Sequence, residues 1–442
     1  MGTSGVRVPL VLPEPASGRV LVALTGDGPR LPEFLVRQIY DEHHLVQRAA
    51  RERLGAEITV LRWVHETRDD GGQLTSRTWV AELQTDDWTP PADHAWVDPG
   101  TLTDAVVAPA NAADLVADLA ATDPPERVPW MRAGWFGAAA AWTADTLTAL
   151  GRPPTGPVEL YKAAPLSAVL RVDTADGPVF FKAPVAMPLF CDEPMMMATL
   201  ARLLPHSVPT PLAIDADRRW MLTGDFGPVL RQGHPTTEVL EVLATRYARL
   251  QQATVPLLDV LLSSGAHDRR LPVLERQLDQ LLADPDLAAG LPPDDRAGWL
   301  ASGPALHGLC RRLAALGVPD TLVHGDFHAG NVADDHSELV VFDWTDACIA
   351  HTFLDLPTLI DFDAGDHADL LIGAYLGCWT DYAPLDRLHE AYRIAEVLAS
   401  LHQLVSYRSI RANTELSLRA TWDWPGPRFV RAILAALPTV AD

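Results

Sequence analysis

Two short segments of the sequence carry residue types in a spacing that suits phosphoryl transfer. One apolar stretch ends at His324-Gly325-Asp326, and Asn331 follows that aspartate five residues later. A second apolar stretch ends at Asp343, twelve residues after the asparagine. One carboxylate can orient an acceptor hydroxyl, while an amide oxygen and a second carboxylate hold Mg²⁺ against nucleotide phosphates. Turn and cap residues in a polar loop are the alternative, but two apolar strands that both end at carboxylates favour the catalytic interpretation.

Lys182 is the next candidate, because Lys162 and Lys182 are the only lysines among 35 basic residues. Lys182 lies inside the apolar run VFFKA, where an ammonium group must reach solvent or a partner. Nucleotide phosphates, with Glu193 on the following helix, would be suitable partners. The alternative is an edge-strand lysine that deters aggregation. Lys162 is expected to face solvent in a loop.

These residues need a strand-rich lobe and a helical lobe to position them. A β-hairpin is predicted from SAVLRVD and VFFKA around TADGP, and a second from PLAID and RWMLTG. Between them, Asp192 as N-cap and Pro194 open a helix. After the connector 224–227 the chain is predicted to be mostly helical, at 236–253, 271–283 and 306–316, with strands at 321–323 and 338–344. Clefts between lobes are favoured ligand sites.

A separate domain is predicted before the proline-rich segment 122–130. Its pattern indicates a short strand and a Gly/Asp turn at 18–28, a helix near 32–54 and two strands, ITVLRWVHE and RTWVAELQ, joined by a turn. A helix at 131–150, ended by Gly151, follows. The predicted domains are a small α+β domain at 1–125, a β-rich lobe at 131–228, and a larger helical lobe at 229–442 with the catalytic loop and the acceptor site.

Composition and charge exclude several classes of protein. Apolar residues make up 48% and charged residues 21%, which excludes a largely disordered chain. The net charge of −23 leaves little basic surface for nucleic acid and would attract cationic small molecules. No CxxC pair, signal peptide or apolar stretch of about 18–20 residues is found. A cytoplasmic protein without a nucleic-acid or membrane partner is therefore expected.

The segments HGDFHAGN and VVFDW resemble the catalytic loop and the metal-binding strand of the aminoglycoside phosphotransferase and choline kinase family. This family has a bilobal protein-kinase-like α+β fold. The resemblance implies that Asp326 is the catalytic base and that Asn331 and Asp343 bind Mg²⁺. It also implies that Lys182 contacts nucleotide phosphates and that Glu193 pairs with it.

The resemblance covers roughly residues 131–442 and extends to residues that support the site. It implies that Asp355 and His324 brace the catalytic loop. The segment before the first hairpin lacks glycine, so Ser167 and backbone amides are expected to cradle phosphate. The implied function is transfer of the γ-phosphate of ATP to a hydroxyl of a small molecule, aminoglycoside-like or a related metabolite, with antibiotic resistance and metabolism both open as its role. The alternatives are a metal-dependent phosphoesterase and a non-catalytic nucleotide-binding module.

An acidic cluster beyond the metal strand, which includes Asp361, Asp363, Asp366 and Asp369, could recognise an aminated substrate. Acids that begin helices or lie in loops are the commoner alternative. A hydroxylated acceptor that carries a positive charge is thus one expectation.

Residues 18–105 have a fainter resemblance to Nudix hydrolases. The segment QRAARERLGAEI aligns with the second half of the Nudix box, where Arg48, Glu52 and Gly55 fit. Other residues occupy three positions at which that family has metal-binding glutamates: Tyr40, Ala49 and Arg53. Because one carboxylate does not assemble a Mg²⁺ site, the resemblance implies a scaffold without hydrolase activity. An unrelated α+β domain is the alternative.

Overall fold

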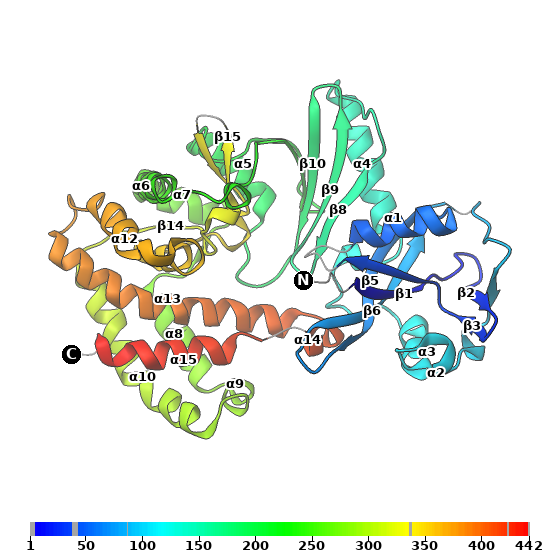
Figure 1. Cartoon of the computed structure of the whole chain (residues 1–442). Coiled ribbons are helices and arrows are strands. Elements are labelled where there is room, and N and C mark those ends of the chain that lie inside the picture. Colours follow the sequence, from blue (N-terminus) through cyan, green and yellow to red (C-terminus); the bar gives the residue numbers. More distant parts are fainter. Residues whose placement is uncertain (1–4, 38–42, 86, 336–337, 422–423, 441–442) are drawn as a thin grey trace. The chain divides into compact units, whose positions relative to one another are not determined.

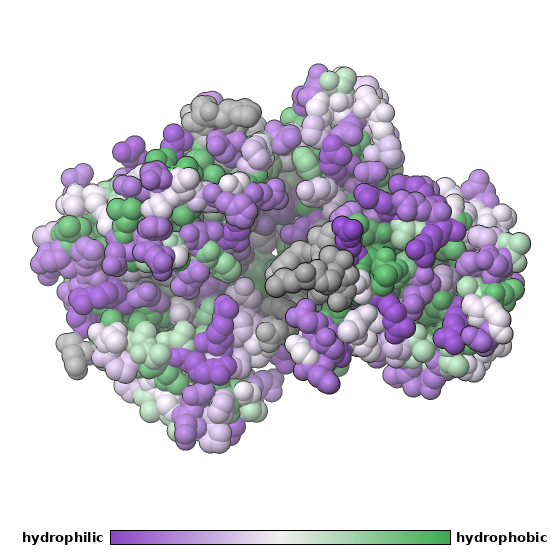
Figure 2. Space-filling model, viewed as in Figure 1, coloured by the Kyte–Doolittle hydropathy of each residue, from purple (hydrophilic) through white to green (hydrophobic). Residues whose placement is uncertain are grey.

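The computed structural model describes residues 5–37, 43–85, 87–335, 338–421 and 424–440 of the chain (Figure 1). The chain forms two compact units. The first comprises Met1–Ala183 and Thr414–Trp422, and the second comprises Pro184–Asn413 and Asp423–Asp442. The predicted domain boundaries stay predictions. The face drawn in Figure 2 carries mostly hydrophilic residues, as expected when apolar side chains form the cores.

Two sheets build the N-terminal part of the first unit. The larger has the strand order β4-β1-β6-β5, in which β1 and β6 are parallel. The smaller has the order β3-β2-β7. Their bounds are β1 Gly5–Val11, β2 Val20–Thr25, β3 Gly28–Arg30, β4 Glu33–Arg37, β5 Ile58–Arg68, β6 Leu74–Leu83 and β7 His94–Val97.

Helices cover both faces of the larger sheet. Helix α1 (His43–Leu54) shares one core with Trp79, whereas α2 (Asp104–Val107) and α3 (Ala112–Ala120) share another with Val80. Neighbouring residues of β6 thus point to opposite faces, as the period of a strand requires.

The predicted strands ITVLRWVHE and RTWVAELQ are confirmed as β5 and β6, but the helix predicted at 32–54 is wrong over its first part. Glu33–Arg37 forms β4, which pairs antiparallel with β1 and alternates exposed and buried residues. This alternation is typical of a strand. The prediction extended the helical pattern of the residues after 42 back over this segment. Glu52, Ala49 and Arg53 lie on α1, and Tyr40 lies outside the described residues. The Nudix-like interpretation stays a prediction.

The rest of the first unit contains α4 (Trp135–Ala149) and the strands β8 (Glu159–Ala164), β9 (Ser167–Thr174) and β10 (Gly177–Pro184), in the order β10-β9-β8. Both the predicted hairpin and the helix before Gly151 are confirmed. The loop predicted around Lys162 is wrong, because Lys162 lies on β8 opposite Val169. Its side chain is exposed, as expected.

An ion-pair cluster ties the segment 414–422 to the first unit. The Arg127 guanidinium is almost fully buried and donates to Glu415 through Nη2 at 2.8 Å and Nε at 3.0 Å. It also donates to Asp123 at 2.5 Å. A buried guanidinium without acceptors would be costly, so this contact holds the segment, including α14 (Leu416–Thr421), against the unit.

The second unit is mainly helical. Its hairpins and short strands are β11 Pro211–Asp215, β12 Trp220–Gly224, β13 His267–Asp268, β14 Asp320–Val323, β15 Val332–Asp335, β16 Glu338–Val341 and β17 Cys348–His351. Its helices are α5 Glu193–Leu203, α6 Thr237–Thr254, α7 Leu258–Ser263, α8 Leu271–Leu282, α9 Pro285–Ala289, α10 Pro293–Ala314, α11 Leu356–Leu359, α12 Ala368–Gly377, α13 Leu385–Asn413 and α15 Gly426–Ala436. The predicted helices and strands of this part are confirmed, although α10 begins earlier than expected. In the described part of the chain, no helix combines the length and apolar character that crossing a bilayer requires.

His351, at the end of β17, is buried without a full set of hydrogen bonds. Its Nδ1 accepts the N–H of Phe353 at 3.3 Å, and its Nε2 has no partner among the described residues. Burial lowers the pKa of His351 to about 3. The neutral ring is therefore the folded form.

This depressed pKa predicts a loss of stability in acid. The unfolded chain takes up a proton below the ordinary pKa of 6.5, whereas the folded chain does not until about 3, so stability falls as the pH drops through that window. Between pH 7 and pH 5 the loss from this group is about 2 kcal/mol. His351→Asn keeps an acceptor for the Phe353 N–H and should remove this part of the acid sensitivity. Urea unfolding of both proteins at the two pH values measures it, and an identical pH dependence would contradict the assignment.

Candidate active site

The segment 324–331, which follows β14 in the second unit, is fixed by a buried carboxylate. Asp355 accepts the N–H of His324 at 2.6 Å with one oxygen and the N–H of Gly325 at 2.9 Å with the other. The Tyr247 hydroxyl donates to the same carboxylate. Burial raises the pKa of Asp355, and these hydrogen bonds oppose that rise. The loop backbone therefore has one well-defined path out of the strand.

Gly325 permits a close approach that no other residue allows. Its φ is +87°, and a Cβ built there would lie 2.6 Å from Cβ of Asp346 and 2.7 Å from its carbonyl oxygen. The Gly325 carbonyl accepts a hydrogen bond from Nε2 of Gln403 on α13 at 2.6 Å. Position 325 thus requires glycine for both its backbone conformation and its contact.

His324 links the loop to the end of β16. Its Nδ1 accepts the N–H of Asp326 at 3.3 Å, and its Nε2 lies 2.9 Å from the carbonyl of Phe342. These two contacts fit the tautomer with the proton on Nε2. The ring is buried and packs 4.8 Å from the ring of Trp344. The supporting role that the sequence resemblance implies for His324 stays a prediction.

Asp326 and Asn331 lie in direct contact. Nδ2 of Asn331 donates to the backbone carbonyl of Asp326 at 2.9 Å and to its Oδ2 at 3.3 Å, which leaves the amide oxygen directed away from Asp326. Nε2 of His328 lies 3.5 Å from the same Oδ2. Burial acts to raise the pKa of Asp326, but the hydrogen bond and charge of His328 outweigh it, so the pKa is lowered. Asp326 therefore stays a carboxylate at neutral pH.

Asp343 follows β16 in a left-handed conformation, with φ 66° and ψ 57°. The backbone N–H of Phe342 donates to the carbonyl of Asn331 at 3.0 Å, which places the two predicted metal ligands on adjoining backbone segments. The Thr345 hydroxyl lies 3.1 Å from Oδ1 of Asp343 and 2.9 Å from Oε2 of Glu193. Glu193 is buried at the start of α5, where Asp192 caps the helix through the N–H of Met195 at 3.3 Å.

Asp346 is a further carboxylate at this place that the sequence analysis did not identify. Its pKa is raised well above the ordinary value by burial first, and then by the charges of Asp326 and Asp343. Arg269 opposes the shift. The only signal in the sequence is its position three residues after Asp343.

An arginine from the connector region supports the other end of the loop. The Arg231 guanidinium donates to Asp363 at 3.0 and 3.1 Å, and Oδ2 of Asp363 accepts the N–H of Ala329 at 2.8 Å. The guanidinium also lies 5.1 Å from the ring centre of Phe362. Asp363, one of the acids expected to recognise an amine, is thus engaged in holding the loop.

Lys182 and Ser167 belong to the first unit. Lys182 is half-buried on β10 between the buried residues Phe181 and Ala183, and Ser167 begins β9. Glu193, its predicted partner, belongs to the second unit. The pairing of Lys182 with Glu193 and the phosphate cradle at Ser167 stay predictions. The structure brings Asp326, Asn331, Asp343, His324 and Asp355 together within one unit.

The family of the chain follows from its sequence. The model of the phosphotransferase enzyme family matches residues 166–388, half of the chain. The chain therefore belongs to the phosphotransferase enzyme family, which confirms the predicted enzyme class, a small-molecule kinase. No curated protein matches the chain.

Three solved structures are similar to the chain. A mutant of aminoglycoside 2′-phosphotransferase-IIIa in complex with GDP is 15% identical, with a TM-score of 0.50 over 69% of this chain and 100% of that one. A choline/ethanolamine kinase family protein from Mesorhizobium loti is 16% identical, with a TM-score of 0.48 over 68% and 94% of the two chains. A choline kinase from Streptococcus pneumoniae is 14% identical, with a TM-score of 0.48 over 68% and 98%. The first of these confirms the predicted α+β, protein-kinase-like fold.

The close approach at Gly325 predicts a difference between two alanine substitutions. Gly317 has a similar φ of +84°, but nothing lies within 4 Å of a Cβ built there. Gly317→Ala should cost about 1 kcal/mol of unfolding free energy from backbone strain alone. Gly325→Ala adds a clash with the Asp346 backbone and should cost about 1–3 kcal/mol more. Urea unfolding followed by circular dichroism measures both, and equal losses would show that the contact is not tight.

Proposed function

We propose that the chain transfers the γ-phosphate of ATP to a hydroxyl group of a small molecule. The observation that supports this most is the convergence of Asp326 and Asn331, in contact at 3.3 Å, with Asp343 at the end of the neighbouring strand. This arrangement provides one carboxylate for the acceptor and oxygen ligands for a metal bound to the nucleotide. Membership of the phosphotransferase enzyme family agrees with the same chemistry.

Asp326 acts on the acceptor hydroxyl. A carboxylate with a lowered pKa is anionic at neutral pH and accepts the hydrogen bond of the hydroxyl, which orients the oxygen toward the γ-phosphate. The proton moves to a carboxylate oxygen of Asp326 as the new oxygen–phosphorus bond forms, and ADP leaves. Asn331 holds the carboxylate through its Nδ2, and Asp355 holds the backbone before it.

The donor set fits Mg²⁺. The Asp343 carboxylate and the Asn331 amide oxygen are hard oxygen ligands, and the amide nitrogen is already occupied by Asp326. Negative charge also accumulates here, since Asp326 and Asp343 both raise the pKa of Asp346. Among the described residues no three His, Cys, Asp or Glu side chains form a metal cluster, so nucleotide phosphates would complete the coordination, as is usual for Mg²⁺. When bound, the ion neutralises charge on the phosphates.

Lys182, Glu193 and Ser167 are the residues we assign to the nucleotide. Lys182 supplies a compact ammonium charge for phosphate oxygens, Glu193 orients it, and Ser167 with backbone amides contacts phosphate at the β8–β9 turn. ATP is the proposed donor. GTP is the natural comparison, because the aminoglycoside 2′-phosphotransferase neighbour was solved with GDP.

The acceptor we propose is a hydroxylated molecule that carries an amine. Phe362 is 59% exposed, and its ring centre lies 5.2 Å from that of His328, which contacts Asp326. The Arg231 guanidinium already lies 5.1 Å from this ring centre, so only the rest of the exposed ring is offered to a cation, which the net charge of −23 would attract. A panel of aminoglycosides, amino alcohols and neutral sugars, assayed with Mg²⁺-ATP for ADP formation, identifies the acceptor and shows whether antibiotics belong to it. Phosphate release from phosphate esters without any acceptor would instead indicate a phosphoesterase.

Asp326→Ala should lower the rate of phosphate transfer by about 10²–10⁴-fold while nucleotide affinity stays nearly unchanged, because a positioned base acts mainly in the transition state. Steady-state kinetics with the accepted substrate and calorimetric titration with Mg²⁺-ATP separate the two quantities. Turnover at the wild-type rate would refute the role of Asp326.

Asp343→Asn should weaken Mg²⁺-dependent nucleotide binding, since replacing an anionic ligand by an amide weakens a site for a hard cation. Asp334→Asn, which changes an exposed acid on β15, is the matched control and should bind as the wild type does. Calorimetry with and without Mg²⁺ makes the comparison. If both variants keep the wild-type affinity, Asp343 is not a metal ligand.

A further inference from the structure

The peptide group that joins Gly325 to Asp326 is the last backbone unit before the carboxylate that we assign to the acceptor. Two side chains hold this peptide group. Its carbonyl accepts a hydrogen bond from Nε2 of Gln403 at 2.6 Å, and its N–H donates to Nδ1 of His324 at 3.3 Å. His324 is part of the loop itself, whereas Gln403 lies on α13. The shorter contact therefore ties the peptide group to a separate element of the unit.

The glycine before Asp326 makes such a tie necessary. Asp355 holds the N–H groups of His324 and Gly325, which belong to the two preceding peptide groups. Rotation of the next peptide group changes ψ of Gly325 and φ of Asp326. Glycine tolerates a wide range of such values because it has no Cβ, so its own sterics do not prevent the rotation. A rotated peptide group would move the Asp326 side chain, and a donor on the Gly325 carbonyl opposes this.

Helix α13 is a fixed support for the donor. The buried Arg269 donates to the carbonyl of His402 at 2.9 Å and to the hydroxyl of Ser406 at 2.8 Å. These two residues flank Gln403 on the helix. The backbone N–H of Arg269 donates to the carbonyl of Ile349 at 2.8 Å. Ile349 lies on β17, which pairs with β14, the strand that leads into the loop. The loop and α13 are thus both tied to one strand.

We propose that Gln403 is a positioning residue for Asp326, whose hydrogen bond keeps the Gly325–Asp326 peptide group in the orientation that directs the carboxylate toward the acceptor hydroxyl. This inference rests on the phosphotransfer function proposed above. The carbonyl has no hydrogen to donate, so only the amide nitrogen of Gln403 can face it. Tyr407 lies one turn further along the same face of α13. Burial first, and then the charges of Asp326 and Asp346, raise the pKa of Tyr407, which agrees with a position of this face beside the site.

Gln403→Met tests the proposal, because methionine has a similar length but no donor. ADP formation by the full chain from Mg²⁺-ATP is measured with water as the acceptor and with each member of the acceptor panel. The rate should fall about 10–100-fold, as expected when a reacting group is displaced by about 1 Å. Calorimetric titration should show an unchanged affinity for Mg²⁺-ATP. Hydrogen–deuterium exchange of the segment 324–331 should become faster, and this measurement needs no acceptor.

Gln252→Met is the matched control. Nε2 of Gln252 on α6 also donates to a backbone carbonyl, that of Cys378, at 2.5 Å. The control should lower the thermal midpoint about as much as Gln403→Met does, but keep the wild-type rate and the wild-type exchange of the loop. Gln403→His returns an N–H at a similar distance from the backbone and should recover part of the rate. If Gln403→Met does not fold, Gln403→Glu, which has the size of glutamine but no donor at neutral pH, should show the same loss.

Three outcomes would each overturn the proposal. They are the wild-type rate in both Gln403→Met and Gln403→Glu, an equal loss of rate in Gln252→Met, and unchanged exchange of the segment 324–331. The result for Asp326→Ala separates these outcomes from a failure of the proposed function. Loss of transfer in Asp326→Ala together with the wild-type rate in Gln403→Met removes only the role of Gln403. Wild-type transfer in Asp326→Ala removes the role of Asp326, and that of Gln403 with it.

Discussion

The candidate site depends on one buried interaction, the hydrogen bonding of the Asp355 carboxylate to the backbone of His324 and Gly325. Both carboxylate oxygens are used, at 2.6 and 2.9 Å, and the Tyr247 hydroxyl adds a third donor. A buried carboxylate without these donors would be strongly unfavourable, so the loop and the carboxylate hold each other in place. The stack of Phe327 on Tyr247, with ring centres 3.5 Å apart, fixes the next turn of the same loop. The position of Asp326 is a consequence of these contacts.

The surroundings of Asp326 and Asp346 shift the pKa values of these two carboxylates in opposite directions. His328 lowers the pKa of Asp326, whereas burial and neighbouring charges raise the pKa of Asp346 well above its ordinary value. Carboxylates with opposite shifts in one place are typical of sites that need one anionic and one neutral group. Asp346 approaches the loop at Gly325, the position where a side chain cannot fit. The close packing of Asp346 against Gly325 therefore brings the carboxyl group of Asp346 near that of Asp326. The backbone geometry of the loop thus determines where negative charge accumulates.

The sequence predicts the parts of this site that are local in the chain. The segment from His324 to Asn331 and the strand that ends at Asp343 are recognisable because their spacing is short and their residue types are specific. Contacts over long separations leave no such pattern: Tyr247 reaches Asp355 across 108 residues and Arg231 reaches Asp363 across 132. The same reason explains which strand pairings could be predicted. The strand pairing of β8 with β9 was missed because β8 is half polar, whereas hairpins with clear turn residues were predicted correctly.

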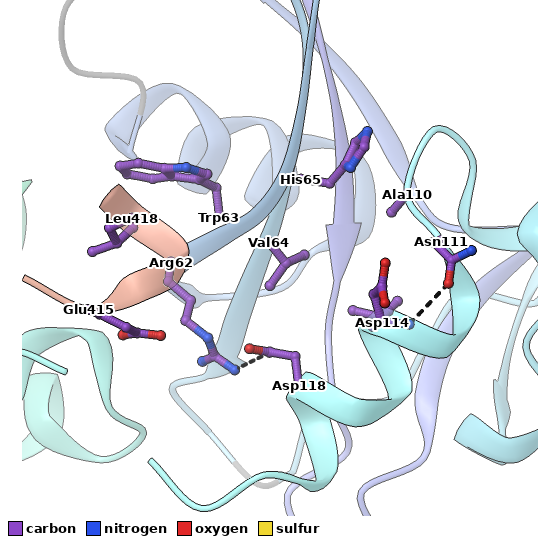
Figure 3. A pocket seen from close by; sticks show the side chains of 11 residues that line it. Arg62, Trp63, Val64, His65, Ala110, Asn111, Asp114, Asp118, Glu415 and Leu418 are labelled. Carbon is purple, nitrogen blue, oxygen red and sulfur yellow. Dashed lines mark hydrogen bonds and ion pairs between the residues drawn. The ribbon is translucent and has the colours of Figure 1, made fainter. Parts of the chain in front are cut away.

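The attachment of the segment 414–422 to the first unit illustrates how a buried charge fixes chain topology. Arg127 and Glu415 are 288 residues apart, and nothing in either local sequence indicates the pair. Both side chains are more than nine-tenths buried, so separating them would leave two uncompensated charges in a region of low polarity. The pair therefore holds a segment from late in the sequence against residues from its first third, and Glu415 and Leu418 of that segment line one cavity with Arg62 of β5 (Figure 3).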